Sequence, residues 1–296
     1  SVFFPSVTLL WQCVLQGFEE FRKIPIIQII NNIIGFLLSL ISTKIYKITG
    51  AVISLLILQI LNYIVMYMVS KKKAKNEKIE MKLKFDNVIK DAILKNAFPA
   101  FLSGVFVLPL LWYTNVKFTK INGYTEFAFF SVCLQWLTII NYLPQQLNQV
   151  KPIYTQLYED KKYAEFKKVI KRMLSISFAF SLIVSIIICL LNQFILATYG
   201  NSYKNAKISF IIMTLTSIFM TLQSQFGAIY QAIGKFWTCL LLNIIWAIFF
   251  IILFFVFINY GTLGYALTYL ISYVMYLIIS IIFFVCILKG VIKNEN

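Results

Sequence analysis

The segment FWTCLLLNIIWAIFFIILFFVFI (236–258) contains 23 residues, and none of them is charged. About 20 consecutive apolar residues cross the hydrocarbon core of a bilayer as an α-helix. Inside that core the backbone must satisfy its own hydrogen bonds, which a continuous run of this length does as a helix. A transmembrane barrel would show alternating segments of about 10 residues instead. The segment therefore predicts a transmembrane helix.

Further apolar runs precede and follow this segment, each between charged or Gly- and Asn-rich breaks. We predict an all-α, polytopic membrane helix bundle with about nine transmembrane helices. Because the chain starts at Ser1 inside an apolar run, we expect it to be N-terminally truncated. The expected spans are Ser1–Gln16, Ile24–Thr43, Ala51–Ser70, Asn96–Val116, Glu126–Val150, Met173–Ala197, Ile208–Gln231, Phe236–Ile258 and Leu263–Leu288.

The composition excludes an ordinary globular protein, because 60% of the residues are hydrophobic and only 13% are charged. Soluble domains carry about 25% charged residues. The chain has no histidine, which excludes histidine-based acid–base catalysis and histidine metal sites. The cysteines lie far apart in apolar runs, with neither CxxC spacing nor a disulfide framework, so we expect no metal and no cofactor. They are Cys13, Cys133, Cys189, Cys239 and Cys286.

Basic residues are distributed unequally between the two sides of the predicted membrane. The connections on one side carry 21 of the 27 Lys and Arg residues, and those on the other side carry 6. The positive-inside rule makes the richer side cytoplasmic, so we expect a multi-pass protein of the bacterial inner membrane with a cytoplasmic C-terminus. Lysines beside hydrophobic helices bind anionic headgroups, so membrane lipids are expected partners and nucleic acid is not.

Two cytoplasmic segments stand out by their charge. KKKAKNEKIE (71–80) is typical of a flexible linker and marks the expected domain boundary. Segment Lys161–Arg172 places Tyr163, Phe166 and Ile170 on one face between lysines, which predicts an amphipathic helix on the membrane surface. A docking site for a partner enzyme is the alternative for this helix.

A weak internal repeat indicates two lobes. Gln16–Leu55 overlays Gln231–Leu270 without gaps, and each contains a helix end, a turn, a span, a turn and a span. Parallel repeats of this kind occur in transporters. We therefore expect residues 1–70 to be the last three helices of an incomplete N-terminal lobe, 71–91 a basic cytoplasmic linker, and 92–296 a six-helix C-terminal lobe.

The predicted spans contain neutral polar side chains rather than charges. No Asp, Glu, Lys or Arg lies away from the span ends, which argues against a proton pump or ion channel within these helices. Amides in hydrocarbon must find partners, so they line a hydrated cavity that binds sugar hydroxyls, or they join helices by hydrogen bonds. The candidate cavity residues are Gln135, Thr138, Asn141, Tyr142, Gln145, Gln149, Gln59, Asn62, Asn31 and Gln223.

Catalysis is not expected of this chain. An integral-membrane transferase needs catalytic groups in substantial outer loops, whereas the outer connections here are short and Glu126 is their only acidic residue. A glycine-rich phosphate loop of the GxxxxGKS or GxxxxGKT type is also absent from the sequence. We therefore predict that the chain is not an enzyme.

Five segments together carry a resemblance to a known family: LKNAFPAFLSGV (94–105), LNQVKPIYTQLYEDKKYAEFKKVIKRM (147–173), YGNSYKNA (199–206), QAIGKFWTCLLLNIIWA (231–247) and YGTLGYALTYLISY (260–273). In this order they resemble Wzx-type polysaccharide and O-antigen flippases of the multidrug/oligosaccharidyl-lipid/polysaccharide (MOP) exporter superfamily, from about the fourth to the twelfth family helix. The resemblance implies a two-lobe, twelve-helix transporter fold around a central cavity. It also implies flipping of an undecaprenyl-pyrophosphate-linked oligosaccharide, an O-antigen or capsule-type repeat unit, by alternating access in polysaccharide biosynthesis.

The central cavity of that family is cationic, whereas the cations that this chain offers to a pyrophosphate lie at the expected cytoplasmic mouth. They are Arg22, Lys23, Lys95 and Lys151. Polysaccharide polymerase or assembly proteins are expected partners, beside the lipid-linked substrate. Two alternatives stay open. One is a multidrug or small-molecule exporter of the same superfamily, which should carry an acidic cation-coupling residue within a span, and the other is a non-catalytic membrane assembly protein.

Overall fold

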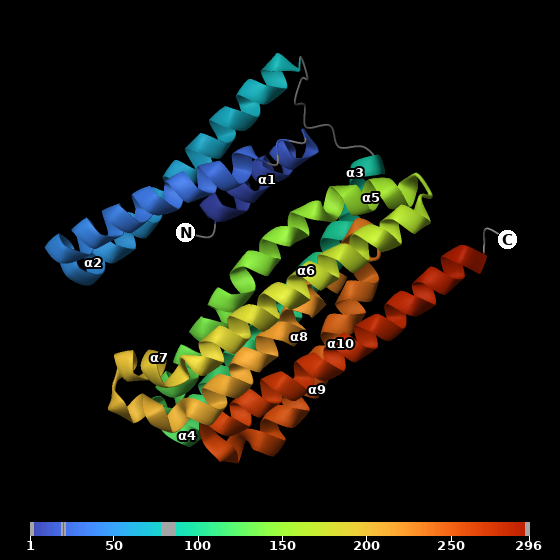
Figure 1. Ribbon diagram of the computed structural model, residues 1–296. Coiled ribbons are helices and arrows are strands. Elements are labelled where there is room, and N and C mark those ends of the chain that lie inside the picture. Colours follow the sequence, from blue (N-terminus) through green and yellow to red (C-terminus); the bar gives the residue numbers. More distant parts are fainter. Residues whose placement is uncertain (1–2, 19, 21, 78–86, 294–296) are drawn as a thin grey trace. The chain divides into compact units, whose positions relative to one another are not determined.

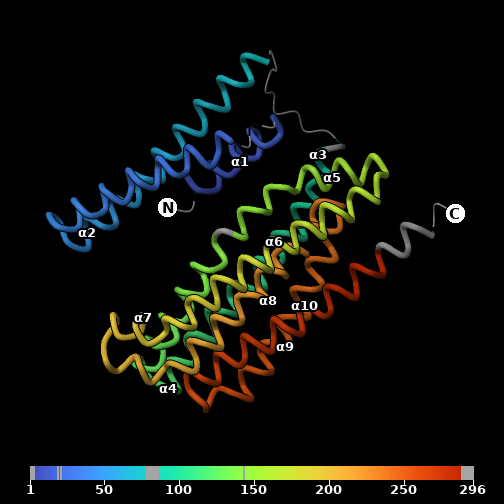
Figure 2. Tube along the Cα trace, in the orientation of Figure 1, coloured from blue at the N-terminus to red at the C-terminus, as the bar shows by residue number. Residues whose placement is uncertain are grey.

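The computed structural model of the chain describes residues 3–18, 20, 22–77 and 87–293 (Figure 1, Figure 2). The regular elements in these ranges are helices, and no strand occurs in them, which confirms the all-α prediction. The chain divides into two compact units, Ser1–Phe85 (unit 1) and Asp86–Asn296 (unit 2), and each is considered by itself. Part of the expected linker, 78–86, lies outside the described residues.

Unit 1 contains α1 (Phe3–Gly17) and α2 (Lys23–Asn76). Helix α2 reverses direction at Lys47, where φ is 52° and ψ is −130°. Because these angles lie outside the α-helical region, the spans expected at 24–43 and 51–70 form the two arms of a hairpin. Helix α2 also continues to Asn76, so the expectation of a flexible linker from residue 71 is wrong for residues 71–76.

The hairpin of α2 closes through a glycine and a small core. A Cβ at Gly50 would lie 2.0 Å from the carbonyl oxygen of Ser42, so only glycine permits this close approach. Leu15 of α1 packs with Ile24 and Met66 of α2, and all three are almost fully buried. Apolar burial between α1 and the two arms of α2 therefore holds unit 1 together.

Unit 2 contains six long helical arms and several short elements. In chain order they are α3 (Asn87–Ala92), the π-helical turn η1 (Ile93–Ala97), α4 (Phe98–Gln146), the 3-10 turn η2 (Leu147–Val150), α5 (Lys151–Glu159), α6 (Tyr163–Leu190), α7 (Asn192–Tyr199), the 3-10 turn η3 (Asn201–Ala206), α8 (Lys207–Ala232), α9 (Phe236–Phe257), the 3-10 turn η4 (Ile258–Tyr260) and α10 (Gly261–Lys293). Helix α4 reverses at Gly123, where φ is 85° and ψ is 168°, and therefore supplies two of the six arms.

Helix α8 is the centre of unit 2, because it packs against α4, α6 and α10, while α9 packs against α4 and α10. The contact between α6 and α8 uses small side chains: Ser177, Ser181 and Ser185 are fully buried, and the Oγ atoms of Ser185 and Ser217 lie 3.0 Å apart. Small residues let two membrane helices approach closely. Because the serines are four residues apart, they lie on one face of α6, and this is the face that packs on α8.

An aromatic core fills the end of unit 2 that lies near α7 (Figure 1). The rings of Phe130 and Tyr265 stack with 4.1 Å between centroids, and the ring of Phe118 lies 4.9 Å from that of Tyr265. Phe250 and Phe254 of α9 complete this fully buried group. Aromatic residues from α4, α9 and α10 thus fix the arrangement of these helices at this end.

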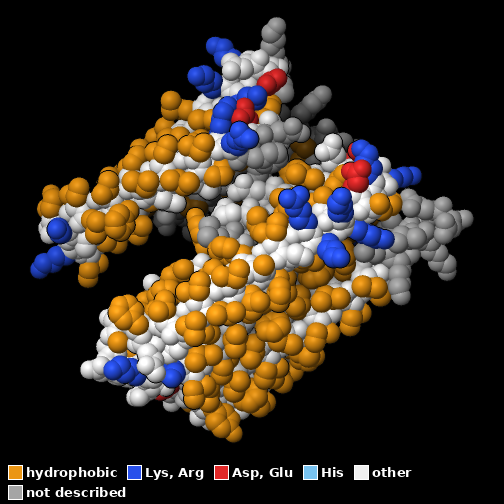
Figure 3. All heavy atoms as spheres, viewed as in Figure 1, with side chains coloured by type: hydrophobic (Ala, Val, Ile, Leu, Met, Phe, Trp, Pro, Cys, Tyr) orange, Lys and Arg blue, Asp and Glu red, His pale blue; other side chains and the backbone are white. Residues whose placement is uncertain are grey.

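The exterior of the long helices is apolar between charged ends (Figure 3). Within the described residues, five helical stretches are long and apolar enough to cross a membrane, and some of them contain a reversal. They are Lys23–Asn76, Ile89–Tyr142, Tyr163–Leu190, Asn201–Ala232 and Phe236–Ile287. Such a large exposed apolar surface is favourable in lipid and unfavourable in water.

Two predicted helices have different boundaries in the structure. The expected surface helix Lys161–Arg172 begins only at Tyr163, where it is the first part of α6, a continuous helix of 28 residues. It is therefore not a separate helix lying on the membrane. Its buried face agrees with the prediction, since Phe166 and Ile170 are buried. The expected span Met173–Ala197 breaks at Leu191, because a new short helix, α7, starts there in a different direction (Figure 2).

Candidate functional site

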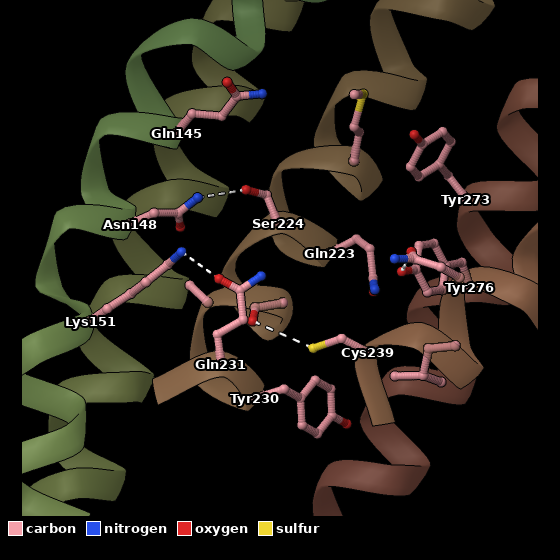
Figure 4. A pocket seen from close by; sticks show the side chains of 15 residues that line it. Gln145, Asn148, Lys151, Gln223, Ser224, Tyr230, Gln231, Cys239, Tyr273 and Tyr276 are labelled. Atoms are coloured by element: carbon pink, nitrogen blue, oxygen red, sulfur yellow. Dashed lines mark hydrogen bonds between the residues drawn. The ribbon is translucent and has the colours of Figure 1, made fainter. Parts of the chain in front are cut away.

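Unit 2 contains a polar cavity of about 300 Å³ between the end of α4, α8, α9 and α10 (Figure 4). Its wall contains five amide side chains, three tyrosines and one lysine, and no carboxylate is found among the described residues that form it. The lining residues are Gln145, Asn148, Lys151, Met220, Gln223, Ser224, Gly227, Ala228, Tyr230, Gln231, Cys239, Leu242, Asn243, Tyr273 and Tyr276. The cavity is therefore neutral and hydrogen-bonding, with one positive group.

The end of α4 brings one wall of the cavity into place. Pro144 lacks an N–H, and after it the helix tightens into the 3-10 turn η2 before α5 begins at Lys151. Gln225 of α8 donates its Nε2–H to the carbonyl oxygen of Pro144 at 3.2 Å. This turn directs Asn148 toward α8, where its Nδ2 donates to Ser224 Oγ at 2.8 Å.

Helices α9 and α10 form the opposite wall. Tyr276 donates its hydroxyl to Asn243 Oδ1, and Asn243 Nδ2 donates to Ser103 Oγ on α4 at 3.1 Å. The ring of Tyr273 lies 6.3 Å from that of Tyr276, and both rings line the cavity (Figure 4). At Gly227 of α8, no atom lies within 4 Å of the place that a Cβ would occupy. This glycine therefore keeps the cavity open on its α8 side.

Two acceptor atoms in the wall have no hydrogen-bond partner among the described residues. They are Gln223 Oε1 and Asn148 Oδ1, and Gln223 is only 5% exposed. A buried acceptor without a partner costs about 1–3 kcal/mol. Both atoms are enclosed by the protein, so they meet the hydroxyl group of a ligand only when the side chain rotates toward the cavity.

Three of the residues predicted from the sequence line this cavity: Gln145, Gln223 and Lys151. Asn141 does not line it. This residue is 1% exposed, accepts a hydrogen bond from Thr221 Oγ1 at 2.6 Å, and donates to Leu137 O at 2.8 Å. Asn141 therefore joins α4 to α8, which is the interhelical alternative rather than the cavity assignment.

The remaining candidates, on α4 and the following turn η2, lie outside the cavity. Gln135, Thr138 and Tyr142 are exposed on the surface of unit 2, and Gln149 donates its Nε2–H to Gln146 Oε1 at 3.1 Å. Tyr199 donates weakly to Gln135 at 3.5 Å. Their contact with a substrate stays a prediction.

The candidates of unit 1 form a separate, smaller polar site. Asn31 Nδ2 donates to Asn62 Oδ1 at 2.9 Å and thereby joins the two arms of α2. Gln59 and Asn62 line a pocket of about 170 Å³ with residues of α1, and Gln59 Oε1 has no partner among the described residues. Asn31 thus has an interhelical role, while Gln59 faces a pocket in its own unit.

The four predicted cationic residues have different surroundings. Lys23 forms an ion pair with Glu20 at 2.8 Å, and hydrogen bonds from Lys23 and then Lys73 hold the pKa of Glu20 below its ordinary value. Lys95 is exposed and pairs with Asp91 at 2.9 Å. Arg22 is exposed in unit 1. Only Lys151 of this group lines the polar cavity of unit 2.

Lys151 donates its Nζ–H to Gln231 Oε1 at 2.6 Å, across the gap between α5 and α8 (Figure 4). Gln231, Tyr273 and Tyr276 also line the cavity, although they were not among the residues predicted from the sequence. Gln231 lies in the last turn of α8, where a glutamine is usually a helix-end residue. The two tyrosines lie in an apolar run, where aromatic residues usually belong to the core. Tyr273 and Tyr276 are three residues apart and so share a helix face, and Asn243 is polar within another apolar span. This pattern is the sequence signal that could have identified the two tyrosines.

The sequence matches no family model, and no curated protein matches it either. Several solved structures are similar. One is an outward-facing multidrug resistance MATE family transporter of the MOP superfamily, with a TM-score of 0.76 and 15% identity over 89% of this chain and 63% of that one. Another is a mutant of the Vibrio cholerae MATE transporter VcmN, with a TM-score of 0.81 and 13% identity over 96% of this chain and 66% of that one.

A third is a MOP superfamily transporter from Pyrococcus furiosus, described as having a binding pocket of reverse polarity. It has a TM-score of 0.66 and 15% identity over 86% of this chain and 61% of that one. Over the part that they share, the chain has the same helical fold as these transporters. It spans a little less than two thirds of the length of most of these structures. The MOP-type fold and the apolar helices together are those of a multi-pass membrane protein.

Proposed function

We propose that the chain belongs to a flippase that moves undecaprenyl-pyrophosphate-linked oligosaccharides across the bacterial inner membrane by alternating access. The basic end of unit 2, which includes Lys151, α5 and the start of α6, would face the cytoplasm together with the C-terminus. The proposal is supported by the MOP-type fold. It is also supported by the segments that resemble polysaccharide flippases.

The observation that carries the proposal is the neutral, amide-rich cavity in unit 2. A sugar head group loses its hydrogen bonds to water when it enters hydrocarbon, at a cost of several kcal/mol per unsatisfied group. The amide side chains of Gln223 and Asn148, rotated into the cavity, replace part of those bonds. Gln145 and the tyrosines Tyr273 and Tyr276 extend the polar wall. The polyprenyl tail stays in the lipid during this exchange.

Movement of the head group then follows from a change of access rather than from covalent chemistry. Transporters of this general kind move their halves as rigid bodies around a fixed site, so that the site opens to one side at a time. The polar wall solvates the sugar while neither side is open. Polysaccharide polymerase or assembly proteins would receive the flipped substrate on the outer side.

A drug or small-molecule exporter is the second candidate, because similar solved structures include a multidrug resistance MATE transporter. A cation-coupled exporter should present an unengaged carboxylate inside the helices. In unit 2, Glu126 accepts hydrogen bonds at Oε2 from Thr262 N at 2.8 Å and from Thr262 Oγ1 at 2.5 Å. Glu126 therefore caps the start of α10, where the helix dipole favours a negative charge, and this use favours the flippase.

Deletion of the gene that encodes the chain tests the proposal. The flippase predicts loss of surface glycan with accumulation of the lipid-linked precursor, and recovery of both when the full-length gene is supplied. Drug sensitivity should stay unchanged. Normal surface glycan without precursor accumulation, together with increased drug sensitivity, would overturn the proposal in favour of the exporter.

A further inference from the structure

A second polar pocket lies at the α7 end of unit 2 and shares no lining residue with the cavity described above. Its volume is about 200 Å³, below the range of about 300–1,000 Å³ that drug-sized ligands occupy. The pocket therefore has room for a small chemical group. Its lining residues come from α7, η3 and the first turn of α8: Asn192, Gln193, Leu196, Lys204 and Lys207.

The wall of this pocket is held in place by the packed core beneath it. Gly200, with φ of 126° and ψ of 158°, ends α7 and lets the chain turn into η3. In η3, the ring of Tyr203 packs edge-on against that of Phe129 in α4, with 5.0 Å between centroids. Leu196, the apolar member of the wall, is buried in the same core. The polar side chains of the pocket are therefore attached to a fixed backbone.

Two lysines give the pocket its charge. Lys204 and Lys207 are three residues apart across the boundary between η3 and α8, so their side chains lie on the same face. Among the described residues, neither ammonium group has an ion-pair or hydrogen-bond partner, and no carboxylate lines the pocket. Two like charges on one face repel each other, so an anion shared between them is favourable.

Asn192 adds a hydrogen-bond acceptor. This residue is 7% exposed, its Nδ2 donates to the carbonyl oxygen of Cys189, and its Oδ1 has no partner within the described part of the chain. A buried acceptor without a partner is unfavourable. Because the terminal torsion of asparagine is broad, a small rotation turns Oδ1 toward the pocket that Asn192 lines, where a hydroxyl group can donate to it. The pocket thus suits a ligand that carries both a phosphate and a hydroxyl group.

The surface beside the pocket indicates the source of such a ligand. Leu190, Phe194 and Ile208 are close neighbours of the lining residues in the chain, and all three side chains are mostly exposed. Figure 3 shows basic side chains at this end of unit 2 next to an apolar exterior. A molecule in the pocket therefore has lipid beside it, which favours a phospholipid over a free phosphate ester.

We infer that this pocket binds the head group of one phospholipid that carries both a phosphate and a free hydroxyl group, as phosphatidylglycerol does. Lys204 and Lys207 bind the phosphate by charge-assisted hydrogen bonds, Asn192 accepts a hydrogen bond from the hydroxyl group, and the acyl chains lie along the apolar exterior. Charge alone attracts any anionic lipid to lysines, so selection of the hydroxyl group is what distinguishes this site. In the orientation proposed above, the lipid belongs to the outer leaflet.

Native mass spectrometry of the full-length protein in detergent measures this binding, with one probe added at a time. The probes are phosphatidylglycerol, phosphatidylethanol and glycerol 3-phosphate. Phosphatidylethanol has the same charge as phosphatidylglycerol and no hydroxyl group, and glycerol 3-phosphate has no acyl chains. The unmodified protein should bind phosphatidylglycerol about tenfold more tightly than phosphatidylethanol, because only the former donates to the buried acceptor. It should bind glycerol 3-phosphate more weakly than either lipid.

The lining residues have separate expected effects. Lys204→Gln/Lys207→Gln should weaken phosphatidylglycerol binding about tenfold, because two charge-assisted hydrogen bonds are lost. Both lysines are exposed, so this variant keeps the fold and tests the site whatever the outcome for Asn192. Asn192→Ala should remove the preference for phosphatidylglycerol and leave phosphatidylethanol binding unchanged. Lys117→Gln/Lys120→Gln is the matched control, a lysine pair of the same spacing that does not line the pocket, and it should bind as the unmodified protein does.

Undiminished phosphatidylglycerol binding by Lys204→Gln/Lys207→Gln, or an equal loss in the control pair, would overturn the site, since charge alone would then explain the binding. Equal affinity of the unmodified protein for the two lipids would overturn recognition of the hydroxyl group. Binding of glycerol 3-phosphate as tight as that of phosphatidylglycerol would overturn the assignment to a lipid. None of these measurements involves transport, so their outcome is separate from that of the proposed function.

Discussion

Unit 2 contains polar side chains at both ends of its helices, and the two ends use them differently. At the α7 end several polar groups pair across helices: Tyr265 donates to Thr114 Oγ1 and lies 2.8 Å from Asn115 Oδ1, and Thr262 bonds to Glu126. Asn192 Oδ1 in α7 is an exception, since it is buried without a partner among the described residues. At the basic end, acceptors of the cavity wall are buried without partners. Paired polar groups hold helices together, whereas polar side chains that line a cavity are positioned to meet a ligand.

The same contrast is visible along one helix. Asn141 and Gln145 are four residues apart on α4 and so lie on nearly the same face. Asn141 lies beside Thr221 of α8, and both its amide oxygen and its amide nitrogen form hydrogen bonds. Gln145 lies one turn further, where Pro144 ends the regular helix and the helices leave a cavity. Depth along the helix, rather than its face, separates an amide that joins two helices from one that lines the cavity.

Gly264→Ala should give the largest effect on stability, because it tests the tightly packed end. A Cβ at Gly264 would lie 1.9 Å from the carbonyl oxygen of Phe257, so the backbone must move to accept it. We expect a loss of about 3 kcal/mol in unfolding free energy, seen as a lower thermal unfolding midpoint of the full-length protein in detergent. An unchanged midpoint would show that this end is not closely packed.

Asn141→Leu should destabilise the protein by about 1–3 kcal/mol, because Thr221 loses its acceptor in a buried position. The same thermal measurement checks this value. Thr221→Val in the same background should add little, since its partner is already absent. Additive losses from the two substitutions would contradict the pairing of these residues.

Tyr265→Phe should have a smaller effect, about 1 kcal/mol. The ring keeps its contacts with Phe118 and Phe130, and only the hydroxyl contacts with Thr114 and Asn115 are lost. Thermal unfolding of the full-length variant measures the loss. Destabilisation as large as that of Gly264→Ala would mean that hydrogen bonds, rather than packing, dominate this end.

Gly227→Ala should have the smallest effect on stability, within about 0.5 kcal/mol, because no atom lies within 4 Å of the added Cβ. The methyl group projects at the cavity wall, so transport should fall although the fold is intact. Gly264→Ala, at the other end of the unit, is the control, because the same substitution there should lower stability strongly. A large loss of stability here would show that the cavity is not open space.

Much of the fold follows from the sequence, because apolar runs of membrane-spanning length form helices in lipid. The run predicted at Phe236–Ile258 is the helix α9, Phe236–Phe257. The break between α6 and α7 was not predictable in the same way, since the apolar run continues through it. Hydropathy measures whether a segment suits lipid, and it does not report a change of direction within the membrane.

The candidate site was predictable only in part. Gln145 and Gln223 were predicted as amides of the cavity and Lys151 as a cation at the cytoplasmic mouth, and all three line the cavity. Gln231 was not identified, because its role depends on Lys151, which is 80 residues away in the sequence. A single sequence shows which side chains are polar, but it does not show which of them meet.

The central claim is that the cavity of unit 2 solvates a sugar head group, and transport by the double variant Gln145→Leu/Gln223→Leu tests it most directly. Transport of lipid-linked oligosaccharide is measured in cells that carry only the variant full-length protein, beside Gln146→Leu as the matched control, an exposed glutamine outside the cavity. Two lost hydrogen-bonding groups predict transport lowered about tenfold with unfolding temperature maintained, and no change in the control. Normal transport by the double variant would contradict the account.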